Sequence, residues 1–158
     1  MVLSLARWID GLEIVHTMRD IAIIGAMINV MHLVALSVFA GAVVIVALRL
    51  MGTGLTRTPL VQVEREARPW LIYGFLGLVV TGIPQLMLQS LKEYYSELFW
   101  MKMEVMVVAI IFTFVIVPKL ARADEARLGP IWGKLAGVAS LLLWGSVAVP
   151  ARLIGLVG

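Results

Sequence analysis

Residues 21–48 read IAIIGAMINVMHLVALSVFAGAVVIVAL, an apolar run with a single ionisable side chain, His32. No Asp, Glu, Lys or Arg occurs between Asp20 and Arg49. A helix of this length is long enough to cross a hydrocarbon core of about 30 Å. An ionisable side chain inside such a span is costly, so it is a candidate for a functional site. The functional question therefore centres on His32.

The composition is that of a membrane protein with several spans. Of the 158 residues, 61% are hydrophobic and 15% are charged, whereas soluble domains have about 45–50% apolar and about 25% charged residues. The chain contains no cysteine, which excludes disulfides, thiolate metal sites and a Cys nucleophile. No nucleic-acid-binding motif accompanies the formal charge of +3, which fits basic loops beside anionic lipid. The expected partner is therefore the lipid bilayer and not a nucleic acid.

We predict an all-α integral membrane fold with four transmembrane helices in an up-down-up-down bundle. The spans are predicted at about 21–48, 70–91, 101–117 and 135–157, within one domain of residues 21–158. Polar connections of nine to nineteen residues separate them, at Met51–Pro69, Lys92–Trp100 and Lys119–Gly133, and such short connections favour antiparallel neighbours.

Residues 1–20 are predicted to form an amphipathic interfacial helix before the first span. Gly11 weakens this helix but need not break it. One face carries Leu5, Trp8, Ile9, Leu12 and His16, and the other carries Arg7, Asp10, Glu13 and Thr17.

The basic residues predict the orientation. Eight Lys and Arg residues fall on the side of the first and third loops and five on the other side. The excess of positive charge marks the cytoplasmic side, so both termini are predicted to lie outside.

Several polar groups are expected at the level of His32. Asn29 lies three residues before it on the same helix, close to the same face. Thr81, Gly82 and Pro84 form the most irregular stretch of the second span, where we expect a kink or a pocket. Lys102 and Arg152 occupy the same end of the third and fourth spans, and His16 of the surface helix is placed beside them.

A neutral imidazole among helices is a common ligand of haem iron, and it also serves other metals and proton transfer. We expect His32 to hold the iron of a b-type haem, with Lys102 and Arg152 meeting its propionates. Asn29 and Thr81 would tune the pocket, Gly82 would supply room, and His16 is a candidate second ligand. The alternatives are a hydrogen-bonded core histidine at His32 and membrane anchors at Lys102 and Arg152. Four methionines are further candidates for haem iron or copper(I), namely Met27, Met31, Met101 and Met103.

Most glycines are expected to be helix-packing contacts, and Gly133-x-x-x-Gly137 fits that pattern.

The stretch His32–Gly41, followed by Leu48-Arg49-Leu50-Met51-Gly52, resembles a large group of small bacterial four-span membrane proteins of unknown function. The same resemblance extends to Arg68-Pro69-Trp70, Thr81-Gly82 and Phe99-Trp100-Met101-Lys102-Met103.

More distantly, the chain looks like the HemJ-type protoporphyrinogen oxidases and the copper-resistance D-type membrane proteins. The HemJ-type likeness implies that His32 binds b-type haem and that Lys102 matches a lysine opening the third span. Relatives often carry a second histidine near the end of the third span, where this chain reads Val115-Ile116-Val117-Pro118-Lys119. The group implies a multi-pass protein of the bacterial cytoplasmic (inner) membrane.

Three functions remain open from the sequence. The first is a membrane haem-b protein for electron transfer or for a porphyrin- or quinone-linked redox step, and thus a haem-dependent oxidoreductase. The second is a transporter of a small solute or metal ion. The third is a non-catalytic structural subunit of a membrane complex. A homodimer or a larger complex is compatible with each of them.

Overall fold

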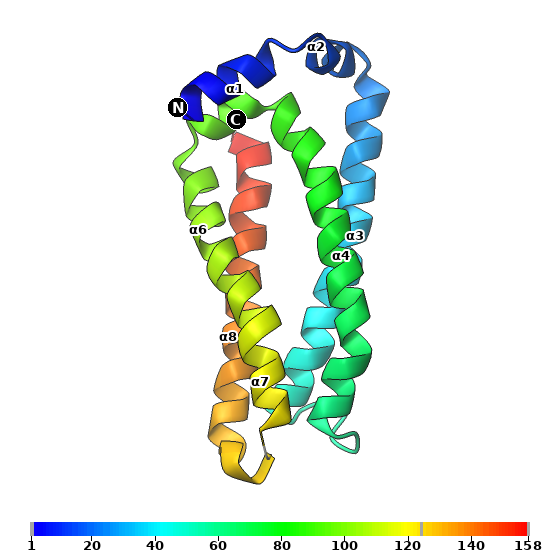
Figure 1. Cartoon of the computed structure of the whole chain (residues 1–158), viewed down its shortest axis with the longest axis vertical. Coiled ribbons are helices and arrows are strands. Elements are labelled where there is room, and N and C mark those ends of the chain that lie inside the picture. Colours follow the sequence, from blue (N-terminus) through cyan, green and yellow to red (C-terminus); the bar gives the residue numbers. More distant parts are fainter. Residues whose placement is uncertain (1, 124, 158) are drawn as a thin grey trace.

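The computed structural model describes residues 2–123 and 125–157, and the side chains of residues 2–123 and 131–150. These residues form helices connected by short turns (Figure 1). The helices are α1 (Val2–Asp10), α2 (Glu13–Asp20), α3 (Ala22–Met51), α4 (Leu60–Leu88), α5 (Ser90–Tyr94), α6 (Glu97–Ile111), α7 (Val117–Arg122) and α8 (Glu125–Val157), with a π-helical segment η1 (Phe112–Ile116) between α6 and α7.

Four helical segments are long and apolar enough to cross a membrane: α3, α4, the continuous run α6–η1–α7, and α8. Consecutive segments run in opposite directions (Figure 1). Large apolar side chains are exposed along their outer faces, as at Ile23, Val80 and Leu142. Because lipid tails are as apolar as leucine, such faces are typical of a bundle in a bilayer. The predicted all-α four-helix membrane fold is confirmed.

All four helical segments extend beyond at least one predicted limit; α3 ends at Met51 instead of residue 48, and α8 begins at Glu125 instead of residue 135. Helix α4 begins at Leu60, ten residues before the predicted start, because its first turns carry charged residues that hydropathy assigns to a loop. The third span continues through Pro118 to Arg122, beyond the predicted end at Val117. Proline lacks an N–H and its ring crowds the carbonyl four residues earlier. The π-helical turn of η1 lies in that preceding stretch and lets the helix continue past the proline.

Residues 1–20 form two helices instead of one. The N–H of Gly11 still bonds to the Arg7 carbonyl, and Leu12 then adopts an extended conformation that separates α1 from α2. Arg19 ties the two helices together through an ion pair with Asp10 at 2.6 Å. Its Nε also donates to the Leu88 carbonyl at 2.9 Å. Together with α5, the two helices cover one end of the bundle (Figure 1).

Helices α3 and α4 have most of their buried side chains in one half of the bundle. We call the part nearest α1, α2 and α5 the capped half (residues 22–38 of α3, 75–88 of α4 and 97–108 of α6) and the remainder the loop half. All buried residues of α3 lie from Phe39 onward, in the loop half. On α4, all buried residues except Thr81 lie between Leu60 and Gly74. The inward side chains of α3 in the capped half, His32 among them, are therefore at most half-buried.

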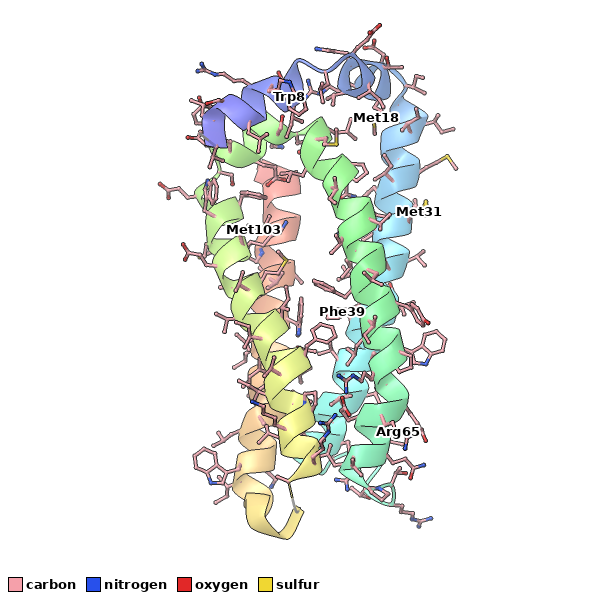
Figure 2. The ribbon with its side chains drawn as sticks, viewed as in Figure 1. Trp8, Met18, Met31, Phe39, Arg65 and Met103 are labelled. Carbon is pink, nitrogen blue, oxygen red and sulfur yellow. The ribbon has the colours of Figure 1, made fainter. Side chains whose placement is uncertain are left out.

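An aromatic layer separates the two halves and joins all four spans. It consists of Phe39, Phe75, Phe114 and Trp144. The Phe39 ring lies 4.5 Å from that of Trp144 and 6.1 Å from that of Phe75, and Phe75 lies 5.7 Å from Phe114, centroid to centroid. Figure 2 shows Phe39 pointing into the centre of the bundle. Tilted and edge-on ring pairs at these distances are favourable, so the layer fixes the spans relative to one another at this level.

Glycines allow the closest helix contacts. A Cβ on Gly74 would lie 2.9 Å from the backbone of Phe39, and one on Gly77 would lie 3.0 Å from the Ala35 side chain. On α8, a Cβ on Gly133 would lie 2.7 Å from the Leu50 carbonyl oxygen, and one on Gly137 would lie 2.7 Å from that of Ala47. The predicted role of Gly133-x-x-x-Gly137 as a helix-packing pair is confirmed.

Replacing Gly137 with alanine should separate α8 from α3 and destabilise the bundle by about 1–3 kcal/mol, the usual cost of overpacking. Gly145→Ala is the matched control on the same helix, since a Cβ there has no atom within 4 Å. Thermal unfolding in detergent should give a lower midpoint for Gly137→Ala and an unchanged one for Gly145→Ala. Equal midpoints for the two variants would contradict the tight contact.

Candidate functional site

His32 forms a hydrogen-bonded pair with Thr81 between α3 and α4. The His32 Nδ1 and the Thr81 Oγ1 are 2.7 Å apart, and the Thr81 hydroxyl donates to the Gly77 carbonyl at 2.6 Å. A carbonyl oxygen has no proton to give, so the single hydroxyl proton of Thr81 lies on the Gly77 side. The Thr81 oxygen therefore accepts from Nδ1–H of His32. This assigns the proton of the neutral imidazole to Nδ1 and leaves Nε2 with a free lone pair.

Gly82 lies directly against the imidazole of His32. A Cβ at Gly82 would be 3.5 Å from the ring carbon Cε1 and 3.9 Å from Nδ1, which is ordinary contact. The register that places Gly74 against Phe39 and Gly77 against Ala35 continues along α4 to this pair. Thr81 is buried, with 8% of its surface exposed, and His32 is half-buried. Three of the predicted site residues, His32, Thr81 and Gly82, are thus brought together.

Lys102 lies on α6, on the other side of the capped half. Its ammonium is 5.7 Å from the centre of the Phe99 ring, a distance at which a cation is attracted to the ring face. The side chain is half-buried, and its positive charge acts on both His32 and Glu93. Among the residues whose side chains are described, Lys102 is therefore a basic group whose charge acts on the histidine.

Glu93 is a member of the site that the sequence did not indicate. It lies on α5, and one of its carboxylate oxygens, Oε2, is buried without a hydrogen-bond partner among the described residues. Burial raises the pKa of the Glu93 carboxyl, while the charges of Lys102 and Lys92 lower it in part. A helix of only five residues is too short for its sequence pattern to predict which side chain faces the interior. In the sequence, only the nearby Lys102, a predicted site residue, could have pointed to Glu93.

Two other predicted residues lie apart from this group. Asn29 is exposed on α3, because three residues rotate a helix by about 300° and so leave it about 60° away from His32. His16 is exposed on α2, where the neighbouring Val15 is fully buried instead. The side chain of Arg152 lies outside the described residues.

The four candidate methionines differ in their surroundings. Met27, Met31 and Met101 are exposed, whereas Met103 is half-buried. Figure 2 shows Met103 on the inner side of α6 and Met31 on the outer side of α3. Met103 is therefore the candidate among the four that belongs to the interior.

The arrangement offers one nitrogen ligand, a cation and a carboxyl group around the interior of the capped half. Among the residues that the structure describes, no three His, Asp or Glu side chains lie together as a site for a bare metal ion. An imidazole with a fixed tautomer can ligate a metal centre that brings its other ligands, or accept a proton.

A protein-family model, described as a family of unknown function (DUF6644), matches residues 14–157. No curated protein matches the chain. No solved structure matches it either. The resemblance to a family of unknown function is thus supported, and these comparisons give no support for the likeness to the HemJ-type or copper-resistance D-type proteins.

Glu93→Gln should stabilise the protein at neutral pH and flatten its pH dependence. Since burial raises the pKa of this carboxyl, the native state binds its proton more tightly than the unfolded chain does, and stability is lost as the pH rises from about 4.5 through the raised pKa. The gain for Glu93→Gln should not exceed about 1 kcal/mol, because the side chain is partly solvated. Glu97→Gln, which removes an exposed carboxylate nearby, is the control. Parallel stability curves of wild type and Glu93→Gln between pH 4 and 8 would contradict the assignment.

Proposed function

Because the chain belongs to the DUF6644 family, whose function is unknown, we propose a function from its own residues: a membrane protein that binds b-type haem and takes part in electron transfer or in a porphyrin- or quinone-linked redox step. The observation that carries the proposal is the hydrogen-bond chain from His32 through Thr81 to the Gly77 carbonyl. Histidines that ligate metals almost always donate their second ring N–H in this way. Because Nδ1 of His32 is occupied by this hydrogen bond, Nε2 would be the atom that binds the iron.

The residues of the capped half fit the requirements of a haem. A porphyrin supplies four ligands of the iron, so one or two side chains complete the coordination. His32 would hold the iron, and the half-buried Met103 is the candidate for a second ligand. Gly82 lets α4 lie close against the imidazole, which fixes the position of the ring. Lys102 would pair with a propionate, and Arg152 is the further basic candidate from the sequence.

The packing of the bundle supports the same placement. The loop half is filled by its own buried side chains and closed by the aromatic layer, whereas the interior of the capped half is less closely packed. When bound, haem supplies a one-electron couple of its iron. The chain's own residues would orient the imidazole, neutralise propionate charge and cover the end of the site with α1, α2 and α5.

The first test is the absorption spectrum of the purified protein, oxidised and dithionite-reduced, after expression with haem supplied. Wild type should show a Soret band and a reduced α band, and both should vanish in His32→Ala. His16→Ala is the matched control and should keep both bands, because His16 is exposed on α2. A featureless spectrum of the wild-type protein would refute the proposal.

Thr81→Val should weaken haem binding while keeping the shape of the residue. Removing the partner of a ligating histidine typically lowers affinity by about 10–100-fold. Thr81→Ser keeps the hydroxyl and should bind haem as the wild type does. Titration of the haem-free protein with haem measures both affinities. An unchanged affinity in Thr81→Val would show that the Thr81 hydroxyl does not position the ligand.

A further inference from the structure

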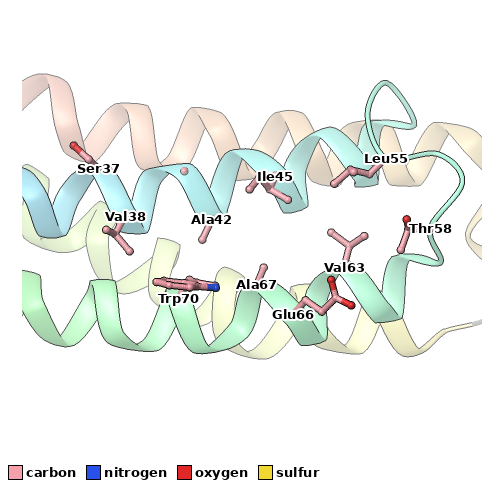
Figure 3. Close-up of a pocket in the computed structure, with 11 residues that line it drawn as sticks. Ser37, Val38, Ala42, Ile45, Leu55, Thr58, Val63, Glu66, Ala67 and Trp70 are labelled. Atoms are coloured by element: carbon pink, nitrogen blue, oxygen red, sulfur yellow. The ribbon is translucent and has the colours of Figure 1, made fainter.

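A groove of about 490 Å³ lies between α3 and α4, mostly in the loop half, and His32 is not among its lining residues. Its inner part is lined by small and aliphatic residues of α3, including Gly41, Ala42 and Ile45. Thr58 lies at its loop end, Glu66 lies farther along α4, and Trp70 lies beside Val38 and Ala42 (Figure 3). The groove is open on one side, so in a bilayer it is accessible to molecules dissolved in the lipid.

The groove exists because Gly41 is not used for helix packing. A Cβ on Gly41 would have no atom within 4 Å. In contrast, Gly74 and Gly77 lie where α3 and α4 touch. The absence of a side chain at Gly41 is therefore not needed for the packing of α3 against α4.

The groove changes from apolar to polar along its length. The part beside Ser37 and Gly41 lies within the apolar run of α3, and the part beside Glu66 lies in the charged first turns of α4. Trp70 stands at the border and is 61% exposed, as is usual for tryptophan at a membrane interface. An occupant would therefore have an apolar tail and a polar head.

The polar end selects the kind of head group. The Glu66 carboxylate accepts one hydrogen bond from Gln62, through Oε1 at 2.9 Å, which leaves its remaining lone pairs to accept from an occupant. The described lining contains this acidic side chain and no Lys or Arg, which disfavours an anionic phospholipid head. The flat indole of Trp70 offers a face for a flat ring.

We propose that this groove binds an isoprenoid quinol, with its hydroxyl-bearing ring between Trp70 and Glu66 and its single tail along Gly41. A quinol hydroxyl donates to the Glu66 carboxylate, and no charge has to be buried. The inference rests on the proposed function in that it names the class of redox partner, but the groove and the His32 site share no residue.

The test measures the binding of a short-chain quinol and its quinone, under anaerobic conditions, to the full chain in detergent. Quenching of tryptophan fluorescence reports binding, since Trp70 borders the groove. Gly41→Leu fills the groove and should weaken quinol binding by about tenfold or more. Gly145→Leu adds the same side chain on α8, where a Cβ also has no atom within 4 Å, and should bind as the wild type does. Wild-type affinity in Gly41→Leu would overturn the proposal.

Glu66→Gln tests the head-group contact without changing the shape of the groove. It should weaken quinol binding by about tenfold, the loss expected for one hydrogen bond to a charged acceptor. The quinone has only acceptors, so its affinity should not fall. An equal effect on quinol and quinone, or full displacement of the quinol by phosphatidylethanolamine at an equal concentration, would overturn the quinol site and identify a lipid groove.

His32→Ala separates this inference from the haem proposal. It should lose the haem spectrum and keep wild-type quinol affinity. If wild-type protein shows the haem bands but does not bind quinol, only the quinol proposal is refuted. If wild-type protein binds quinol but shows no haem bands, only the proposal of haem binding is refuted.

Discussion

The close approach of α3 and α4 determines most of the other contacts around His32. Gly74 lies against the backbone of Phe39, so closely that a methyl group there would be 2.9 Å from main-chain atoms. Two packed helices in contact at one such point keep a fixed register along their length. That register places Gly77 opposite Ala35 and Gly82 opposite His32. The Thr81 hydroxyl thereby reaches Nδ1 of His32 and accepts a hydrogen bond from it. The backbone contact at Gly74 thus determines indirectly which nitrogen of the histidine carries the proton.

The second constraint is the unequal packing of the two halves. In the loop half, small residues let the spans come together, as at Gly133 and Gly137 of α8 against α3. The aromatic layer ends this packed region, and beyond it the spans keep polar or half-buried side chains toward the interior. A bundle that packed uniformly would gain stability. The capped half instead keeps Lys102, whose charge acts on both His32 and Glu93, and ionisable groups at such positions are candidates for a functional site.

The two proposed sites occupy different positions along α3 and α4. His32 lies two helical turns from Phe39 on the capped side, whereas the groove begins at Ser37, beside the aromatic layer, and continues into the loop half. His32 bonds to Thr81 where the two helices touch, and the groove opens sideways between the same helices. Such a separation suits a protein in which one ligand stays bound and the other exchanges with the bilayer.

The four spans and the all-helical fold could be predicted from the sequence, because hydropathy and helix length are properties of consecutive residues. The sequence also drew attention to His32, Thr81 and Gly82, which the fold brings together, and it predicted the packing pair Gly133 and Gly137, since ionisable, polar and small residues stand out within apolar spans. It could not decide that Thr81 rather than Asn29 meets His32, or that Glu93 turns inward. Those contacts depend on the rotation and register of helices distant in sequence. Only the tertiary structure sets these, through backbone contacts at a few glycines.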